Sequence, residues 1–233
     1  MKAFLLAAGL GTRLKPLTDS IPKCLVPIND RPLLHYWLDI CERGGITEAL
    51  INIHHHPDRV MDFLGTYRGK VGITTSYEKE LLGSGGTILK NREFVAGDDS
   101  FLIVYADNFS TLELRKLRDF HSRHKTLCTL AVYESKRPET GGVVEFDSKG
   151  NVVSFEEKPK TPKSNFISSG IFITTNRIFN YFPEKDFIDF GYDVLPRLVG
   201  NMVAYIMKEF IQDIGTPQSY AEVCKIAKTL VLG

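Results

Sequence analysis

Two glycines and two cations near the N-terminus form the segment best suited to chemistry. Gly9 and Gly11 stand in the stretch Gly-Leu-Gly-Thr-Arg, which ends at Arg13, and Lys23 follows ten residues later. Glycine lets a backbone approach a ligand closely, and the N–H groups of such a turn can bind phosphate oxygens. Arg13 adds a permanent charge whose fork geometry suits phosphate. The segment therefore predicts a site for a nucleoside triphosphate.

Two common phosphate-binding motifs are excluded. A dinucleotide fingerprint, G-x-G-x-x-G, requires a third glycine where this chain has Leu14. A P-loop, G-x-x-x-x-G-K-[ST], does not match the stretch either. At this point the alternative interpretation, a glycine turn that binds no ligand, is not excluded, because short glycine patterns often occur without function.

The composition is typical of a folded protein without a general affinity for polyanions. The 233 residues are 43% hydrophobic, and 29 basic residues face 28 acidic ones, for a net charge of +1. This balance argues against binding to nucleic acid or to a membrane surface. We expect no signal peptide, and no apolar run approaches the ~18 residues of a spanning helix. The four cysteines are scattered without a C-x-x-C pair, so we expect neither zinc nor disulfides but a reduced, cytoplasmic protein.

Expected strands and helices alternate over the first half of the chain. The strands are expected at 3–8, 49–53, 71–77, 101–105 and 127–133, and the helices at 33–43, 57–67 and 112–125. This alternation predicts an α/β fold, a Rossmann-like three-layer α/β/α arrangement with a mixed, mostly parallel sheet. Ligands bind beyond the carboxyl ends of such strands. The glycine turn and Asp107 both follow strands, so they are expected at the same edge.

The second half of the chain has a different pattern. Strands at 142–146 and 152–155 flank the turn Asp-Ser-Lys-Gly, which is a hairpin signature. A further strand is expected at 166–173, and helices at 192–200 and 216–229, with a short helix at 87–91 after a second glycine turn. We therefore expect an antiparallel-rich lobe that can hold a second substrate. No linker or repeat interrupts the chain, so the lobes are expected to share one core.

Five further motifs follow one another along the chain. They are Leu-Gly-Ser-Gly-Gly-Thr at 82–87, Asp107 after a strand, Gly-Gly-Val-Val at 141–144, Glu-Lys-Pro at 157–159 and Asp-x-Gly-Thr at 213–216. With these motifs the chain resembles the sugar nucleotidylyltransferases from Lys2 to about Ala221. That family joins a sugar 1-phosphate to a nucleoside triphosphate and releases pyrophosphate. The resemblance implies one nucleotidyltransferase domain over 1–233, with a nucleotide-binding half at about 1–135 and a sugar-phosphate-binding half at about 136–233.

The resemblance also implies roles for the charged residues. Arg13, Lys23 and Asp107 would be catalytic, with Arg13 on the leaving pyrophosphate and Lys23 near the α-phosphate. Asp107 and Asp213 would hold Mg²⁺, a hard cation that prefers carboxylate and phosphate oxygens. No general base is required, because the attacking phosphate monoester has a second pKa of about 6 and is largely ionised near pH 7. Catalysis then depends on positioning and on neutralising charge.

Two sets of binding residues follow from the resemblance. The nucleotide-binding set is Leu6, Ala7, Ala8, Gly9, Gly11, Thr12, Arg13, Lys23, Glu80, Ser84 and Gly85. The sugar-phosphate-binding set is Asn108, Gly142, Glu157, Lys158, Ser169 and Gly170. Within the second set, Lys158 would contact the sugar phosphate and Glu157 the sugar hydroxyls.

The resemblance favours one pair of substrates and leaves others open. The 82–86 turn looks closer to the guanylyltransferases than to the thymidylyl branch, which implies GTP with mannose 1-phosphate or manno-heptose 1-phosphate. The Ala-Asp-Asn at 106–108 also resembles the choline-phosphate cytidylyltransferases, so uridylyl, thymidylyl and cytidylyl transfer stay open. A non-catalytic subunit that binds a nucleotide sugar is a further alternative. Such a subunit would be expected to lose one of Arg13, Lys23, Asp107 and Asp213, and all four are present. Relatives in this family often form homo-oligomers.

Three consecutive histidines are the remaining group with ligating chemistry. His54, His55 and His56 follow an expected strand. Successive side chains alternate across a strand, so three neighbours cannot all face one ion. We therefore expect them to end the strand and to precede a helix at Pro57, without binding a metal.

Overall fold

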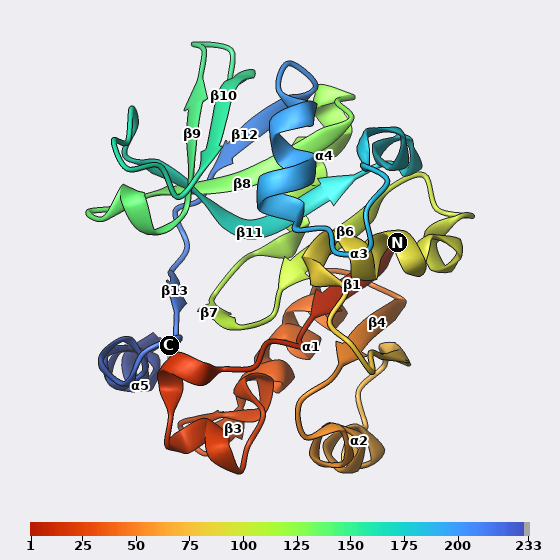
Figure 1. The fold of residues 1–233 in the computed structure, drawn as a ribbon, viewed down its shortest axis with the longest axis vertical. Coiled ribbons are helices and arrows are strands. Elements are labelled where there is room, and N and C mark those ends of the chain that lie inside the picture. Colours follow the sequence, from red (N-terminus) through yellow and green to blue (C-terminus); the bar gives the residue numbers. More distant parts are fainter. Residues whose placement is uncertain (231–233) are drawn as a thin grey trace. The chain divides into compact units, whose positions relative to one another are not determined.

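The computed structural model describes residues 1–230, which form two compact units built from discontinuous segments. The turn unit, named for the first glycine turn, comprises Leu5–Leu81, Tyr105–Leu114 and the segment that begins at Glu209. The hairpin unit comprises Met1–Phe4, Leu82–Val104 and Arg115–Lys208. Both units can be followed along the chain by colour in Figure 1. The predicted division into nucleotide-binding and sugar-phosphate-binding halves stays a prediction.

The turn unit combines parallel strands with amphipathic helices. Its elements are the end of β1 (Lys2–Leu6), β2 (Pro27–Ile28), β3 (Arg31–Pro32), α1 (Leu33–Arg43), β4 (Glu48–Ile53), α2 (Pro57–Thr66), β5 (Gly72–Tyr77), β7 (Asn108–Ser110), β13 (Ile211–Asp213) and α5 (Pro217–Leu230). β4 lies between β1 and β5 and pairs with β5 in parallel. Helix α1 covers the predicted residues 33–43, and its buried face repeats with helical spacing.

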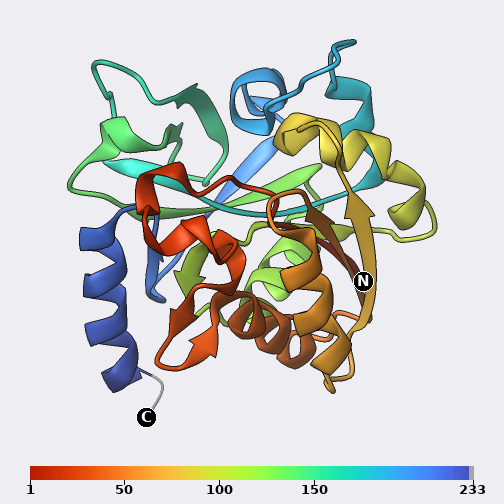
Figure 2. The same cartoon turned by 60° about the horizontal axis from the view of Figure 1, so that its bottom comes forward.

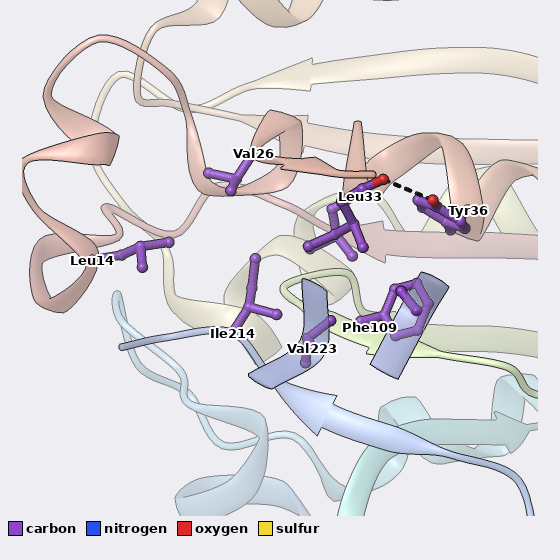
Figure 3. Packing of buried hydrophobic residues seen from close by; sticks show 9 residues of the cluster. Leu14, Val26, Leu33, Tyr36, Phe109, Ile214 and Val223 are labelled. Carbon is purple, nitrogen blue, oxygen red and sulfur yellow. Dashed lines mark hydrogen bonds between the residues drawn. The ribbon is translucent and has the colours of Figure 1, made fainter. Parts of the chain in front are cut away.

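One hydrophobic cluster in the turn unit joins its N-terminal and C-terminal segments. Ile214 and Val223 pack with Leu14, Leu33 and Phe109, all of them buried (Figure 3). Helix α5 therefore lies beside the N-terminal turns, as Figure 2 also shows, and its Tyr220 hydroxyl donates to the Pro27 carbonyl at 2.8 Å. Burial of these side chains fixes the segment around Asp213 against the segment around Arg13.

The hairpin unit is mainly antiparallel. Its elements are α3 (Gly83–Lys90), β6 (Phe101–Tyr105, whose last residue belongs to the turn unit), α4 (Leu114–His124, whose first residue belongs to the turn unit), β8 (Cys128–Glu134), β9 (Gly142–Phe146), β10 (Val152–Glu157), β11 (Phe166–Thr174) and β12 (Met202–Ile206). The strands follow the order β10-β9-β11-β6, with β8 paired to β11 and β12 (Figure 1). Only the β8–β12 pair among these is parallel. The predicted hairpin is confirmed, with β9 at the expected residues 142–146 and β10 extending to Glu157.

Two predicted helices differ from the observed structure. The helix expected at 87–91 begins earlier, at Gly83, because the second glycine turn itself forms the first turn of α3. The helix expected at 192–200 is instead a π-turn at Phe190–Val194 followed by a 3-10 turn at Leu195–Leu198. Pro196 lacks the backbone N–H that a regular helix would use there. Within residues 1–230, no helix combines the length and apolar character that a membrane span requires.

Candidate active site

Four predicted residues of the turn unit form one ion cluster. The Lys23 ammonium donates to Asp107 Oδ2 at 2.9 Å and to Asp213 Oδ1 at 2.7 Å. Arg13 Nη2 lies 3.6 Å from the other oxygen of Asp213. The Lys23 side chain is only 6% exposed, whereas those of Asp107 and Asp213 are 41% and 45% exposed. A buried cation thus holds two carboxylates that face solvent.

The pairing of two short strands brings the two aspartates together. In the antiparallel pair β7–β13, Asp213 stands opposite Asn108, the residue after Asp107. Ile214, which follows Asp213, is fully buried in the hydrophobic cluster. Lys23 begins the 3-10 turn Lys23–Leu25, which buries both Lys23 and Cys24. The sequence motifs predicted Lys23, Asp107, Asn108 and Asp213 as site residues. Strands β7 and β13, which bring the two aspartates together, were not predicted.

The electrostatics of the cluster favour its ion pairs. Burial alone lowers the pKa of the Lys23 ammonium, but the charges and hydrogen bonds of Asp107 and Asp213 outweigh it, so the net pKa is raised. A side chain at Gly215 would place its Cβ 2.5 Å from Asp213 Oδ2 and 2.9 Å from Arg13 Nη2. Glycine at this position therefore leaves the space in which the Arg13 and Asp213 side chains meet.

The first glycine turn leaves β1 as an open loop. Leu6, Ala7 and Ala8 are buried, whereas Gly9 is exposed, and no atom lies within 4 Å of a Cβ built on it. Gly11 has a φ of +65°, and its carbonyl accepts a hydrogen bond from the Thr18 hydroxyl at 2.8 Å. The turn then passes through Thr12, which is exposed. Open space over Gly9 is what close approach of a ligand to this backbone requires.

Two buried polar side chains, neither of them among the predicted site residues, fix the start of this turn by hydrogen bonds. Asn52 Oδ1 accepts from the Ala7 N–H at 2.7 Å, and Asn52 Nδ2 donates to Glu78 Oε1 at 2.9 Å. Both side chains are buried. These two hydrogen bonds connect the ends of β1, β4 and β5 at one edge of the parallel strands. The only signal in the sequence was a polar residue inside an apolar strand, at Asn52.

The three histidines bond to backbone carbonyls of two segments. His54 Nδ1 contacts the Glu78 carbonyl at 2.8 Å, and His55 Nε2 contacts the Thr18 carbonyl at 3.2 Å. His56 Nε2 lies 3.0 Å from the carbonyl of Asp19. Over the part of the chain that the structure describes, no group of three or more His, Cys, Asp or Glu residues is arranged for a metal ion. His55 and His56 thus hold the loop after the glycine turn, whereas His54 holds the backbone at Glu78.

In the hairpin unit, Glu157 lies in a cradle of two glycines. A Cβ on Gly142 would come within 2.7 Å of Glu157 Oε2, and one on Gly191 within 2.8 Å. Lys158 Nζ lies 3.7 Å from Glu157 Oε1, and Lys158 has a φ of +49°, which is uncommon for a residue with a side chain. Burial raises the pKa of the Glu157 carboxyl, Lys158 opposes this, and the nearby Asp189 adds to it. The cradle holds a partly desolvated carboxylate beside a half-exposed cation.

The second glycine turn contacts the segment that carries Gly191. The N–H groups of Gly85 and Gly86 donate to the Ile188 carbonyl at 2.8 and 3.1 Å, and Ser84 Oγ accepts from the Phe190 N–H at 2.8 Å. A side chain at Gly83 or Gly85 would collide with Ile188. Packing against this segment thus accounts for the glycines, and nucleotide binding by Ser84 and Gly85 stays a prediction. Glu80, in the turn unit, is exposed.

The remaining predicted sugar-site residues also make backbone contacts. Ser169 is buried, and its hydroxyl donates to the Ala131 carbonyl at 2.8 Å. Gly170 has a φ of +74°, and its N–H donates to Ser168 Oγ at 3.2 Å. Asn108 accepts a hydrogen bond from Trp37 Nε1 at its carbonyl. Their roles toward a sugar phosphate stay predictions.

Comparison of the sequence with known proteins finds one family over nearly the whole chain. The model of the nucleotidyl transferase family matches residues 2–229. The D-glycero-alpha-D-manno-heptose 1-phosphate guanylyltransferase of Campylobacter jejuni is 32% identical over 223 residues, which cover 94% of this chain and 97% of that protein. The probable mannose-1-phosphate guanylyltransferase 1 of Oryza sativa is also 32% identical, over 94% of this chain. This chain spans 63% of the length of the Oryza protein.

Solved structures share the fold. A putative glucose-1-phosphate thymidylyltransferase from Bacillus anthracis superposes with a TM-score of 0.88 at 24% identity, covering 97% of this chain and 95% of that one. HddC from Yersinia pseudotuberculosis, in complex with GMP-PN, has a TM-score of 0.80 at 26% identity and covers 97% of this chain and 98% of its own. The predicted fold class, a mixed and mostly parallel sheet with helices and additional antiparallel strands, is confirmed.

Proposed function

The chain belongs to the nucleotidyl transferase family, and from this premise we propose that it joins a sugar 1-phosphate to a nucleoside triphosphate. The products are a nucleoside diphosphate sugar and pyrophosphate. The observation that carries this proposal is the ion cluster, in which Lys23 contacts both Asp107 and Asp213. Two cations and two carboxylates beside an open glycine turn suit the handling of a triphosphate. A structural salt bridge alone would not require the open space over Gly9.

In the proposed reaction an oxygen of the sugar phosphate attacks the α-phosphorus, and the bond from that phosphorus to the pyrophosphate breaks. The attacking oxygen is already ionised near neutral pH, so no side chain has to remove a proton. Arg13 then neutralises the leaving pyrophosphate, and Lys23 neutralises charge at the α-phosphate. Such electrostatic stabilisation and positioning supply most of the catalysis in phosphoryl and nucleotidyl transfer.

The residues present fit a magnesium ion. The ion cluster offers two half-exposed carboxylates, each with one oxygen engaged by Lys23. In residues 1–230 no third carboxylate, histidine or cysteine completes a protein-only metal site with them. Magnesium is commonly bound in this way, through one or two carboxylates together with substrate phosphates and water. We propose that Asp107 and Asp213 hold Mg²⁺, which supplies positive charge to the triphosphate when bound.

For the second substrate we propose the Glu157 cradle. Lys158, with its half-exposed ammonium, would bind the sugar phosphate, and Glu157 would accept hydrogen bonds from sugar hydroxyls.

GTP with mannose 1-phosphate or manno-heptose 1-phosphate is the proposed substrate pair. It is supported by the names of the Oryza and Campylobacter relatives and by the GMP-PN complex of the Yersinia protein. All four cysteines are free thiols, which agrees with the proposed cytoplasmic location in nucleotide sugar biosynthesis.

The test is pyrophosphate release from the purified full chain with Mg²⁺, each nucleoside triphosphate and a panel of sugar 1-phosphates. Release is expected with GTP and one of the two manno-configured phosphates. Choline phosphate belongs in the panel, because release of pyrophosphate with CTP and choline phosphate would identify a choline-phosphate cytidylyltransferase and not an enzyme that activates a sugar phosphate. Absence of release with every pair would overturn the proposed activity and favour a nucleotide-sugar-binding subunit. Release with UTP, dTTP or CTP alone would overturn the choice of guanine and keep the reaction.

A further inference from the structure

The position of Lys23 has a consequence for the order in which metal and nucleotide arrive. Its ammonium sits between the two carboxylates, 2.9 Å from Asp107 Oδ2 and 2.7 Å from Asp213 Oδ1. A cation shared by the same two oxygens would have to occupy that place. Lys23 therefore acts as a tethered cation between the two carboxylates.

The charge of the whole cluster supports the same point. Arg13 and Lys23 carry two positive charges, and Asp107 and Asp213 carry two negative ones. A divalent cation approaching this neutral group gains no net attraction, and it is repelled by the nearby ammonium. A triphosphate brings several negative charges, which both attract the metal and offer Lys23 new acceptors.

We propose that Lys23 excludes divalent metal from the Asp107–Asp213 pair until a nucleotide binds. The inference rests on the proposed function, because it takes these aspartates as the magnesium ligands. Nucleotide phosphates draw the Lys23 ammonium away from Asp107 Oδ2 and Asp213 Oδ1, and these two oxygens then become available to the metal. Metal and nucleotide consequently bind with positive cooperativity, and the protein does not retain metal by itself.

The geometry distinguishes Lys23 from the other cation of the cluster. Lys23 is 6% exposed and contacts both carboxylates, whereas Arg13 is 71% exposed and approaches only Asp213, at 3.6 Å. Solvent screens the Arg13 charge far more effectively. Arg13→Met therefore removes the same formal charge as Lys23→Met but does not vacate the position between the carboxylates.

The experiment measures Mn²⁺ binding to the full chain by electron paramagnetic resonance, without nucleotide and without turnover. The wild-type protein is expected to bind Mn²⁺ with a dissociation constant weaker than about 0.1 mM, in the range of weak carboxylate sites. Lys23→Met and Lys23→Gln should each bind at least about tenfold more tightly, because a competing charge has been removed. Lys23→Arg keeps the charge and should bind as weakly as the wild type. Arg13→Met should gain clearly less than Lys23→Met.

Two outcomes would overturn the inference. One is tight Mn²⁺ binding by the wild-type protein in the absence of nucleotide, a measurement that needs no variant. The other is a folded Lys23→Met or Lys23→Gln protein, verified by circular dichroism, that binds Mn²⁺ no more tightly than the wild type. Adding Asp107→Asn to Lys23→Met should abolish the gain, which assigns it to the carboxylates. Wild-type pyrophosphate release together with unchanged Mn²⁺ affinity in the variants would reject this inference alone. A gain in Mn²⁺ affinity in the Lys23 variants, together with no turnover by the wild-type protein, would reject the proposed function alone.

Discussion

The ion cluster of the turn unit and the Glu157 cradle of the hairpin unit hold their carboxylates by opposite means. Asp107 and Asp213 are nearly half exposed and paired with the buried ammonium of Lys23. Glu157 is 15% exposed, and two glycines give it space while a cation stands at 3.7 Å. Charge pairing dominates in the first region, and close packing dominates in the second.

This difference agrees with the different ligands proposed for the two regions. A triphosphate and a metal ion change the local charge by several units, so their site needs charges that can exchange partners. A sugar presents neutral hydroxyl groups in a fixed stereochemical pattern, so its site needs an acceptor held in one place. The first region is therefore expected to depend on charge and the second on shape.

The largest effect is expected from Asp213→Asn. This substitution removes a proposed metal ligand and one of the two charges that hold Lys23. Pyrophosphate release at saturating substrates should fall by about 10²–10³-fold, as for loss of a group that stabilises transition-state charge. The far-ultraviolet circular dichroism spectrum should stay the same, because Asp213 is the last residue of β13 and its side chain is half exposed.

Asp62→Asn is the matched control, because Asp62 is an exposed aspartate on α2 of the same unit. It should leave turnover unchanged. Near-normal Mg²⁺-dependent turnover in Asp213→Asn would show that charge at this position is dispensable and would break the comparison.

A smaller effect, on stability, is expected from Asn52→Ala. The substitution removes two buried hydrogen bonds, one to the Ala7 N–H and one to Glu78. The free energy of unfolding should fall by about 1–3 kcal/mol, the usual cost of disrupting buried polar groups. Urea denaturation measures this change. The exposed Asn151, which bonds to Asp147, provides the control, and Asn151→Ala should change the free energy by less than about 0.5 kcal/mol. Equal losses in the two variants would contradict the importance of burial.

Local sequence patterns predicted the longer helices and strands. They did not predict the short strands β7 and β13, which form only by pairing between distant parts of the chain. Helix α1 and strand β6 occupy their predicted residues, because helical spacing and a continuous apolar run are local signals. Strands β7 and β13 have three residues each, and beside them the Ser110 hydroxyl donates to the Phe210 carbonyl, 100 positions away in the chain. No local pattern can encode such a pair. The motif resemblance nevertheless named both aspartates that this pair brings together.

The second glycine turn shows the opposite case. A glycine-rich stretch indicates close approach of something to the backbone, and phosphate is only one candidate. In the structure the approaching group is the Ile188 segment, whose carbonyl accepts from Gly85 and Gly86. The identity of the neighbour depends on tertiary packing about a hundred residues away in the chain. The same ambiguity applies to Asn52, whose partners Ala7 and Glu78 directly follow two other strands, β1 and β5.

Gly191→Ala should affect only the second substrate. The added Cβ would lie 2.8 Å from Glu157 Oε2, so the carboxylate must shift. The KM for the sugar 1-phosphate is expected to rise by about tenfold, equivalent to about 1.4 kcal/mol. The KM for the nucleotide should not change. Gly97→Ala is the control, since a Cβ there has no atom within 4 Å. An unchanged KM for the sugar phosphate would show that Glu157 tolerates displacement and that shape is not decisive.

The smallest effect concerns the pH dependence of stability. Burial raises the pKa of Glu157 above its ordinary value of 4.5, so the folded state binds the proton more readily than the unfolded chain does. The contribution of this carboxyl to stability is therefore lost as the pH rises from 4.5 through its folded pKa. Glu157→Gln cannot titrate, and its unfolding free energy relative to the wild type should rise across that window.

Asp193→Asn gives a control of opposite sign within the same unit. The hydrogen bond from Lys185 lowers the pKa of the Asp193 carboxyl below 3.8, so the folded state prefers its charged form. That stabilisation is present above pH 3.8 and is lost as the pH falls through the folded pKa. Asp193→Asn should accordingly be less stable than the wild type at neutral pH, with the difference shrinking in acid. Urea denaturation from pH 3 to pH 8 measures both variants. If the two difference curves sloped in the same direction, Glu157 would be a paired carboxylate like Asp193, and the contrast between a packed and a paired carboxylate would fail.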